Sequence, residues 1–291
     1  IISMKSIFLF FDISVIFILV KFLRESGRNP VNVLIYAWSP LVLISFAARG
    51  HCDSLQIFLV ILALYFYSRQ KNLSSMTSIA FAVAAKVTSV IIAPFLLLKN
   101  KPVYIIVLFL IIILLYLPYI NASDGLFYTL LHFGSQYHFN DSVHFVIFCL
   151  THGSKQWTSI ITTAVFGIIL LYLYKKYFDI SCLPAEKTIG NINDDKIESK
   201  KSLLPDSNVL RFPFLAIGAF LTMSPTVHPW YLTWIVPFLC FYRSKAWIIL
   251  TGTIVFYYFM NHELFSSMIK YNNEWVWKEV HWLKLPEYLP F

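Results

Sequence analysis

The chain has few charged residues for its length. Asp, Glu, Lys and Arg make up 13% of its 291 residues, and 58% of the chain is hydrophobic. Soluble domains carry about 25% charged and about 45–50% apolar residues, so this shortage of charge excludes an ordinary soluble domain. The mean hydropathy is +0.68. Apolar runs of about 17–25 residues, each long enough to cross a bilayer once, recur along the chain. The sequence therefore predicts an all-α, polytopic integral membrane protein.

Cysteine is also scarce, and no two cysteines form a CxxC pair. The four are Cys52, Cys149, Cys182 and Cys240. This spacing indicates neither a zinc knuckle nor a disulfide framework, so we predict no metal ligands among them. The net charge of +8 is spread over short connections between apolar runs rather than gathered in one patch. We therefore expect membrane lipids, and no nucleic acid, as partners.

Nine apolar runs are candidate crossings, and together they predict a single transmembrane domain over residues 1–291. The runs cover 6–23, 31–47, 54–68, 76–98, 103–120, 157–175, 211–224, 229–242 and 246–260. With breaks and a short run at 143–150, we expect about 9–11 transmembrane or re-entrant helices. The polar segment 178–208 is predicted to be a disordered cytoplasmic connector. Because the first residue, Ile1, lies almost inside an apolar run without a charged leader region, we expect upstream sequence to be missing.

The positions of Lys and Arg predict which connections face the cytoplasm. Basic residues mark the connections 21–28, 69–71, 99–101, 175–211 and 243–245, whereas 121–142 and 222–227 contain none. The positive-inside rule places the first set in the cytoplasm. The opposite, non-cytoplasmic face then collects 48–54, 121–156, 222–228 and the tail from 261.

This topology requires a break inside the run 76–98, because the basic connections on both sides of it are predicted to be cytoplasmic. We predict two short helices that rise to about Lys86 and return, so that Lys86 lies at a tip, facing protein or water. The sequence leaves a second interpretation open, in which one tilted helix carries a snorkelling lysine.

The segment 48–54, with the sequence ARGHCDS, is the first candidate site. Arg49 suits a phosphate, His51 a hydroxyl or a phosphate, and Asp53 an acceptor hydroxyl proton. A structural alternative is a capping box, in which Asp53 caps the following helix and Gln56 supports it three residues later. A divalent metal at His51 and Asp53 has no second pair of ligands in the sequence to support it.

The segment 224–231, with the sequence SPTVHPWY, is the second candidate site. Pro229 suits the first turn of a helix over 229–242, whose start would offer backbone amides to a phosphate. His228 and the indole of Trp230 stand beside that start, and Tyr231, next to them, is expected to line the substrate. The alternative is an interfacial belt of aromatic anchors.

Two further polar residues are weaker candidates for lining the substrate. Asn140 lies in the predicted external segment, where it also fits a glycosylation sequon. Asp12 is an acid inside the first crossing, and such residues are functional suspects by default. A structural hydrogen bond to a neighbouring helix explains Asp12 equally well.

Three passages in order resemble the GT-C superfamily of membrane glycosyltransferases, in particular its mannosyltransferase-like, family 87-like members. They are YAWSPL (36–41) with GHCD (50–53), AAK (84–86) with Pro94, and SP (224–225) with HPWY (228–231) and Pro237. The passages span about residues 5–260. The resemblance implies a GT-C-like bundle that is incomplete at its N-terminus, since the family's usual catalytic acid lies in a first external loop that we expect this chain to lack.

The resemblance also implies an activity. It is the transfer of a hexose, commonly mannose or glucose, from a polyprenyl-phosphate carrier to a lipid or glycan acceptor. The reaction would take place on the non-cytoplasmic face of a bacterial inner membrane or an endoplasmic reticulum membrane. No cofactor is firmly implied beyond the lipid-linked sugar donor. The residues expected to contact the donor phosphate are Lys86, His228, Arg49 and Trp230, and Asp53 and His51 are expected to act in catalysis.

Two other classes of membrane protein compete with this interpretation. A transporter or flippase of lipid-linked or anionic solutes would also use broken helices and midplane charges, but the halves of this chain show no convincing self-similarity. A membrane-bound acyltransferase would need a paired His and Asn or Asp motif, and none stands out.

Overall fold

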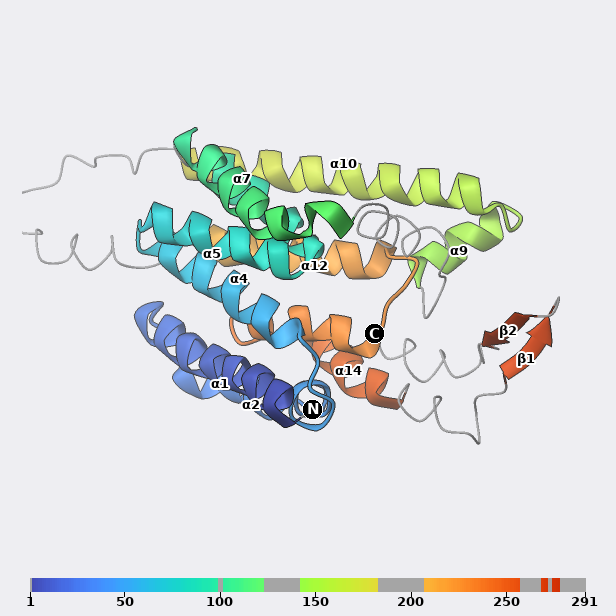
Figure 1. Ribbon diagram of the computed structural model, residues 1–291, viewed down its shortest axis with the longest axis horizontal. Helices are drawn as coiled ribbons and strands as arrows, with labels where there is room; N and C mark the ends of the chain where they lie inside the picture. The colour runs from blue at the N-terminus through green and yellow to red at the C-terminus, as the bar shows by residue number, and fades with distance from the viewer. Residues whose placement is uncertain are drawn as a thin grey trace, which may run out of the picture.

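The protein is a bundle of helices, described here from a computed structural model. The structure describes residues 2–98, 102–122, 142–182, 207–256, 268–271 and 274–277. The longer helices lie alongside one another in Figure 1, and they are α1 (Ile2–Glu25), α4 (Asp53–Ser68), α5 (Asn72–Ala85), α7 (Val103–Tyr116), α10 (Lys155–Cys182) and α12 (Ser207–Met223). The predicted all-α class is confirmed, with one addition. Strands β1 (Met268–Tyr271) and β2 (Glu274–Trp277) form an antiparallel pair in which Met268 lies opposite Trp277.

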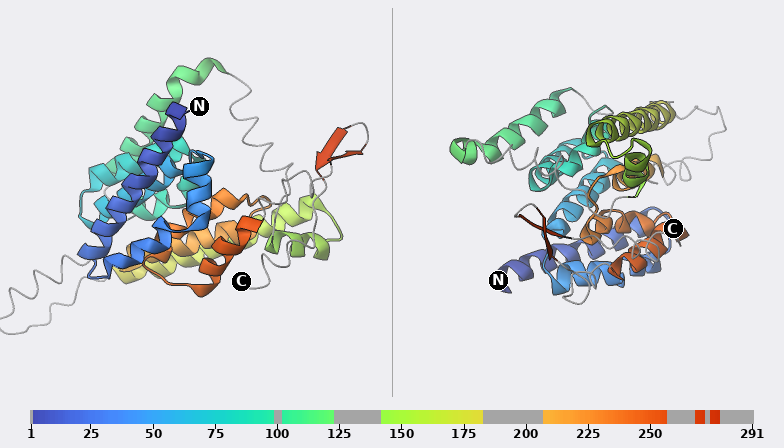
Figure 2. Two further views of the ribbon diagram at one scale, coloured as in Figure 1. Left: turned by 90° about the horizontal axis from the view of Figure 1, so that it is seen from below. Right: turned by 90° about the vertical axis from the view of Figure 1, so that its right-hand side faces the viewer.

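Among the described residues, three helical stretches are long and apolar enough to cross a membrane. They are Ile2–Glu25, Val103–Ile120 and Lys155–Tyr177, and the bent pair Pro30–Ala37 and Pro40–Ala48 is a fourth candidate. Both views in Figure 2 place α7 at the edge of the bundle. Its side chains Ile106, Phe109 and Ile113 are more than half exposed, as expected for a helix that packs against lipid.

The predicted crossing 31–47 is not one continuous helix. It consists of a 3-10 helix Pro30–Val33, α2 (Leu34–Ala37), α3 (Pro40–Val42) and a π-helix Leu43–Ala48, with a bend of 50° in the middle. Ser39 is extended there, with ψ 120°. The residue before a proline disfavours the helical conformation, so Pro40 explains the break.

The predicted break at Lys86 is confirmed. Helix α5 ends at Ala85, Lys86 is extended with φ −156° and ψ 121°, and a 3-10 helix Val87–Ile91 and α6 (Ala93–Leu98) follow. Gln56 near the start of α4 contacts Thr88 and Ser89, and Ile61 further along α4 lines a cavity with Ile92. The chain after Lys86 therefore runs back along α4 in the opposite direction to α5, and a single tilted helix is wrong.

The predicted helix 229–242 is wrong. The chain forms a 3-10 helix Pro229–Trp234 and a short α13 (Val236–Leu239), and only then α14 (Lys245–Thr253) with a 3-10 turn Ile254–Phe256. Pro237 has no amide proton to donate to the preceding turn, which prevents a continuous α-helix. The connector predicted over 178–208 is shorter at both ends, because α10 extends to Cys182 and α12 begins at Ser207. The residues between them lie outside the described part.

The basic connections and the segment 48–54 lie at opposite ends of the bundle. At one end Glu25 forms an ion pair with Arg69 at 2.5 Å, Arg28 donates to the carbonyl of Phe241, and Arg243 donates to Asn32. We call this the basic end. At the other end Lys5 donates to the carbonyl of Ala48, and Ser54 to that of Phe8. The basic connections 21–28, 69–71 and 243–245 thus share one end, and the assignment of that end to the cytoplasm stays a prediction.

Candidate functional site

The turn 48–53 is shaped by Gly50, which has a positive φ of 71°. Its amide donates to the carbonyl of Phe46, and the amide of His51 donates to the carbonyl of Ser45. Lys5 crosses over the turn, with its Nζ 2.8 Å from the carbonyl oxygen of Ala48. These bonds place His51 and Asp53 at the start of α4.

Replacing Gly50 by alanine is expected to destabilise this turn by about 1–3 kcal/mol, because the backbone conformation is strained for an L-residue. A Cβ at this position would also lie 2.7 Å from Cγ of Lys5. Gly167 in α10 is the matched control, since a Cβ there would meet nothing within 4 Å. The measurement is the thermal unfolding of both variants in detergent, and equal stability of the two would contradict the expectation.

Asp53 lies at the centre of a polar cluster and is 2% exposed. Its Oδ1 accepts from Nζ of Lys86 at 2.5 Å and from Nε1 of Trp234 at 2.7 Å. The capping-box interpretation is wrong. Cys52 is the N-cap residue without a side-chain bond, and the Gln56 amide donates instead to Thr88 and Ser89. The Asp53 carboxylate thus joins α4 to the broken hairpin and to the 3-10 helix 229–234.

Lys86 lies on two aromatic faces in addition to its ion pair. Its Nζ is 4.3 Å from the ring centroid of Tyr231 and 4.5 Å from that of Trp234, and these two rings stack at 4.7 Å. An ammonium group over aromatic rings is stabilised by the negative charge of their faces. The Lys86 side chain keeps 24% of its surface exposed, so a ligand can still reach it.

Two imidazoles stack on one indole beside this ion pair. The ring centroids of His51 and His228 lie 4.3 Å and 4.4 Å from that of Trp230, with interplanar angles of 18° and 8°. Burial and the nearby charge of Lys86 lower the pKa of His228 to about 4. Burial also lowers the pKa of His51, opposed by Asp53 and reinforced by Arg49 and Lys86. Both rings are therefore neutral at pH 7, so each can offer one N–H donor but no positive charge to a phosphate.

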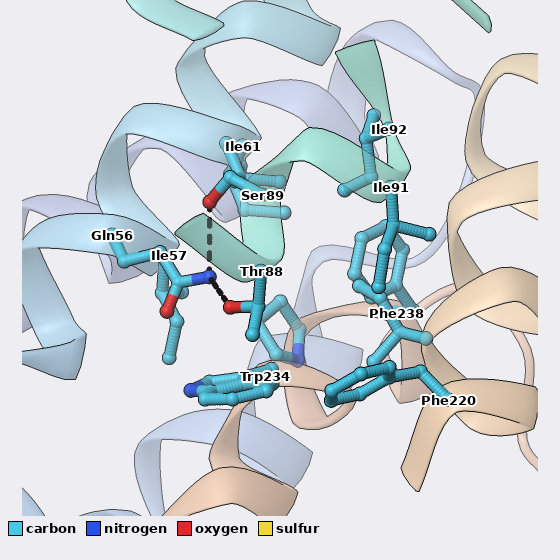
Figure 3. A pocket seen from close by; sticks show the side chains of 13 residues that line it. Gln56, Ile57, Ile61, Thr88, Ser89, Ile91, Ile92, Phe220, Trp234 and Phe238 are labelled. Atoms are coloured by element: carbon cyan, nitrogen blue, oxygen red, sulfur yellow. Dashed lines mark hydrogen bonds between the residues drawn. The ribbon is translucent and has the colours of Figure 1, made fainter. Parts of the chain in front are cut away.

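A small cavity lies beneath this cluster, between α4, the turn after Lys86 and α12 (Figure 3). Its volume is about 20 Å³, room for a single water molecule. The Nε2 of Gln56 lies 3.0 Å from the hydroxyls of Thr88 and Ser89. Among the described residues, Oε1 of Gln56 and Nε2 of His51 are buried without a hydrogen-bond partner. Gln56 thus ties the tip of the hairpin to α4.

The remaining candidate residues are placed differently. Arg49 is exposed beside His51, and its charge acts on the His51 ring. Asp12 is 5% exposed and accepts from the hydroxyl of Tyr36 at 2.7 Å, so it joins α1 to α2 and does not line the site. Asn140 lies outside the described residues. Trp230 does not begin an α-helix but lies in a six-residue 3-10 helix, so the α-helix start expected to hold a phosphate is absent. Contact of Trp230 with the donor phosphate stays a prediction.

Sequence reasoning missed Trp234 and Gln56. Neither was among the candidate site residues: Gln56 entered only through the capping-box alternative and Trp234 only through the aromatic-belt alternative, although both bond to polar partners in the site. The signal that could have found Trp234 is its spacing of four residues from Trp230, which is one turn of the α-helix that the sequence predicts. Within the described ranges, no group of three or more His, Cys, Asp or Glu residues is arranged to hold a metal ion.

Comparison with known protein families identifies the N-terminal third of the chain. Residues 1–100 match the family model described as alpha-(1->6)-mannopyranosyltransferase, N-terminal domain. The matched region contains Arg49, His51, Asp53 and Lys86. The match confirms the predicted resemblance to GT-C mannosyltransferases and supports glycosyl transfer as the general activity. No curated protein and no solved structure gave a match.

Proposed function

We propose that this protein transfers a hexose, mannose in the first instance, from a polyprenyl-phosphate carrier to a glycan or lipid acceptor. The reaction takes place on the non-cytoplasmic face of the membrane. The observation that carries the proposal is the position of Lys86. Its ammonium group lies at the tip of a broken hairpin, beside two imidazoles, in a region that matches a mannosyltransferase family. The distribution of basic residues supports the choice of face.

Lys86 is suited to stabilise the leaving group of such a reaction. When the sugar–phosphate bond breaks, negative charge grows on the polyprenyl phosphate. A fixed positive group in a partly buried site stabilises this transition state more than it stabilises the bound substrate. The ion pair with Asp53 and the faces of Tyr231 and Trp234 hold the ammonium in place. Arg49 is a second cation for the phosphate, and the neutral ring of His228 offers one N–H donor.

The reaction is a direct displacement at the anomeric carbon. The acceptor hydroxyl oxygen forms the new bond, and the bond from the anomeric carbon to the phosphate oxygen breaks with its electron pair leaving on the phosphate. The hydroxyl proton passes to a carboxylate. That group is either the acid that the resemblance places in the first external loop or Asp53. We assign Asp53 first to positioning Lys86, since both Lys86 and Trp234 donate to its Oδ1.

The test is a comparison of sugar donors with the full-length protein in reconstituted vesicles. We expect transfer of radiolabelled mannose from polyprenyl-phosphate mannose and none from a nucleotide sugar supplied alone. A nucleotide sugar that serves as the direct donor would refute the proposed donor class. Movement of the lipid-linked sugar across the bilayer without transfer would instead favour the flippase alternative.

A further inference from the structure

A second, larger cavity lies beside the candidate site. It occupies the space between α9 (Val143–Leu150), the first half of α10 and the end of α12, and its volume is about 350 Å³. Ligand pockets usually measure about 300–1,000 Å³, so this cavity has room for a small ligand. Its polar wall consists of His144, Lys155, Gln156, Ser159, Thr162 and Thr163. Phe166 and Phe220 form an aromatic wall.

Apart from His144 in α9, the polar wall lies within a stretch that is long and apolar enough to span the membrane, Lys155–Tyr177. Gln156, Ser159 and Thr163 recur at helical spacing and follow one side of α10, and Thr162 is buried. Exposed apolar side chains, Trp157, Ile160 and Ile168 among them, alternate with this side. Polar side chains at membrane depth are tolerated when they face a cavity, so the hollow suits a polar ligand better than a lipid chain.

Aromatic contacts connect this cavity to the Asp53 cluster. The ring centroid of Phe220 lies 5.9 Å from that of Phe166 and 6.3 Å from that of Trp234, whose indole donates to Asp53. Phe220 lines both the large cavity and the small one beneath Gln56. Ser224 and Pro225 line the large cavity as well, four and three residues before His228. The cavity and the candidate site therefore share a wall.

We propose that this cavity binds sugar units of the acceptor glycan. Its hydroxyl, amide, imidazole and ammonium groups can each bond to sugar hydroxyls, and the rings of Phe166 and Phe220 suit the apolar C–H faces of a pyranose. The inference rests on the proposed function, which requires an acceptor hydroxyl to reach the donor near Lys86. It assigns to α10 a role in acceptor recognition that the family match over residues 1–100 does not reach.

The test fills the cavity from one position and leaves the neighbouring position as a control. Ser159→Phe places a ring in the cavity, whereas Ile160→Phe adds the same ring at an adjacent residue that is 50% exposed and does not line the cavity. Binding of radiolabelled α-1,6-mannotriose to the full-length protein is measured by equilibrium dialysis. We expect Ser159→Phe to weaken binding by about 10-fold or more, equivalent to about 1.4 kcal/mol, and Ile160→Phe to leave it unchanged.

A second variant guards against misfolding of Ser159→Phe. Thr163→Val removes one hydroxyl with little change in volume, and it should weaken mannotriose binding by about 3–10-fold at an unchanged unfolding temperature. Wild-type affinity in both variants, or no binding of mannotriose by the wild-type protein, would overturn the inference. Transfer from polyprenyl-phosphate mannose is measured in parallel. If mannotriose binds as expected but no mannose is transferred, the proposed function fails while the glycan site stands.

Discussion

Replacing Lys86 by methionine is expected to lower kcat for mannosyl transfer by about 100-fold or more, the loss found when one preorganised group that stabilises transition-state charge is removed. Methionine keeps much of the length and apolar volume of the lysine stem but has no charge, so the contacts with Tyr231 and Trp234 are largely preserved. The measurement is the rate of transfer from polyprenyl-phosphate mannose at saturating donor and acceptor. Lys176→Met in α10 is the control, since Lys176 is exposed and far along the chain from the site.

This single substitution also has a structural cost that must be separated from catalysis. Without Lys86, the Asp53 carboxylate is left as a buried charge that is 2% exposed. Removing one partner of a buried ion pair typically destabilises a protein by about 3–5 kcal/mol. The second substitution Asp53→Asn removes that charge and keeps an oxygen that can accept from Trp234. We therefore expect the double variant to unfold at a temperature much closer to that of the wild-type protein than Lys86→Met does.

The second large effect is expected at His228. Replacing it by phenylalanine keeps a ring that can stack on Trp230 but removes the N–H donor, and kcat should fall by about 100-fold. Because the pKa of His228 is about 4, its ring is neutral throughout, and the loss should be the same from about pH 6 to about pH 8. A loss confined to the acidic part of this range would show that a protonated His228 is required.

Two comparisons distinguish the effect of losing the N–H group of His228 from the effect of losing its stacked ring. His228→Ala removes both, so equal losses in the phenylalanine and alanine variants would assign the effect to the N–H group alone. His152→Asn is the control for histidine loss elsewhere, because His152 is exposed and asparagine accepts its positive φ of 53°. A wild-type kcat in His228→Phe would show that His228 does not donate to the phosphate of the sugar donor and only packs against Trp230.

The hairpin at Lys86 could be predicted because the positions of Lys and Arg along the chain can be read directly from the sequence. Two basic connections on either side of one apolar run cannot lie on the same face unless the run is broken. A lysine inside that run has a favourable position only at the tip. The predicted gathering of 48–54, the Lys86 tip and 222–228 at one end follows from the same assignment of connections to the two faces. The bond between Asp53 and Lys86 and the stacking of His51 and His228 on Trp230 confirm that these segments meet.

The partners of individual polar side chains could not be predicted in this way. Asp53 and Gln56 have the spacing of a capping box, but tertiary partners that are 33 and 181 residues distant from Asp53 satisfy its carboxylate instead. The continuous helix predicted after Pro229 does not form, because Pro237 interrupts it after about two turns. The sequence left both a functional and a structural role open for Asp12, and only the fold shows that the hydroxyl of Tyr36 donates to it, which supports the structural role.

The most direct test of the central claim is kcat of the double variant Lys86→Met, Asp53→Asn for transfer from polyprenyl-phosphate mannose. The double variant has no unpaired buried charge, so its activity reports on the Lys86–Asp53 pair rather than on folding. If Lys86 stabilises the leaving phosphate, the variant unfolds near the wild-type temperature and its kcat stays about 100-fold lower. A kcat equal to that of the wild-type protein would show that the ion pair is structural and that the phosphate binds elsewhere.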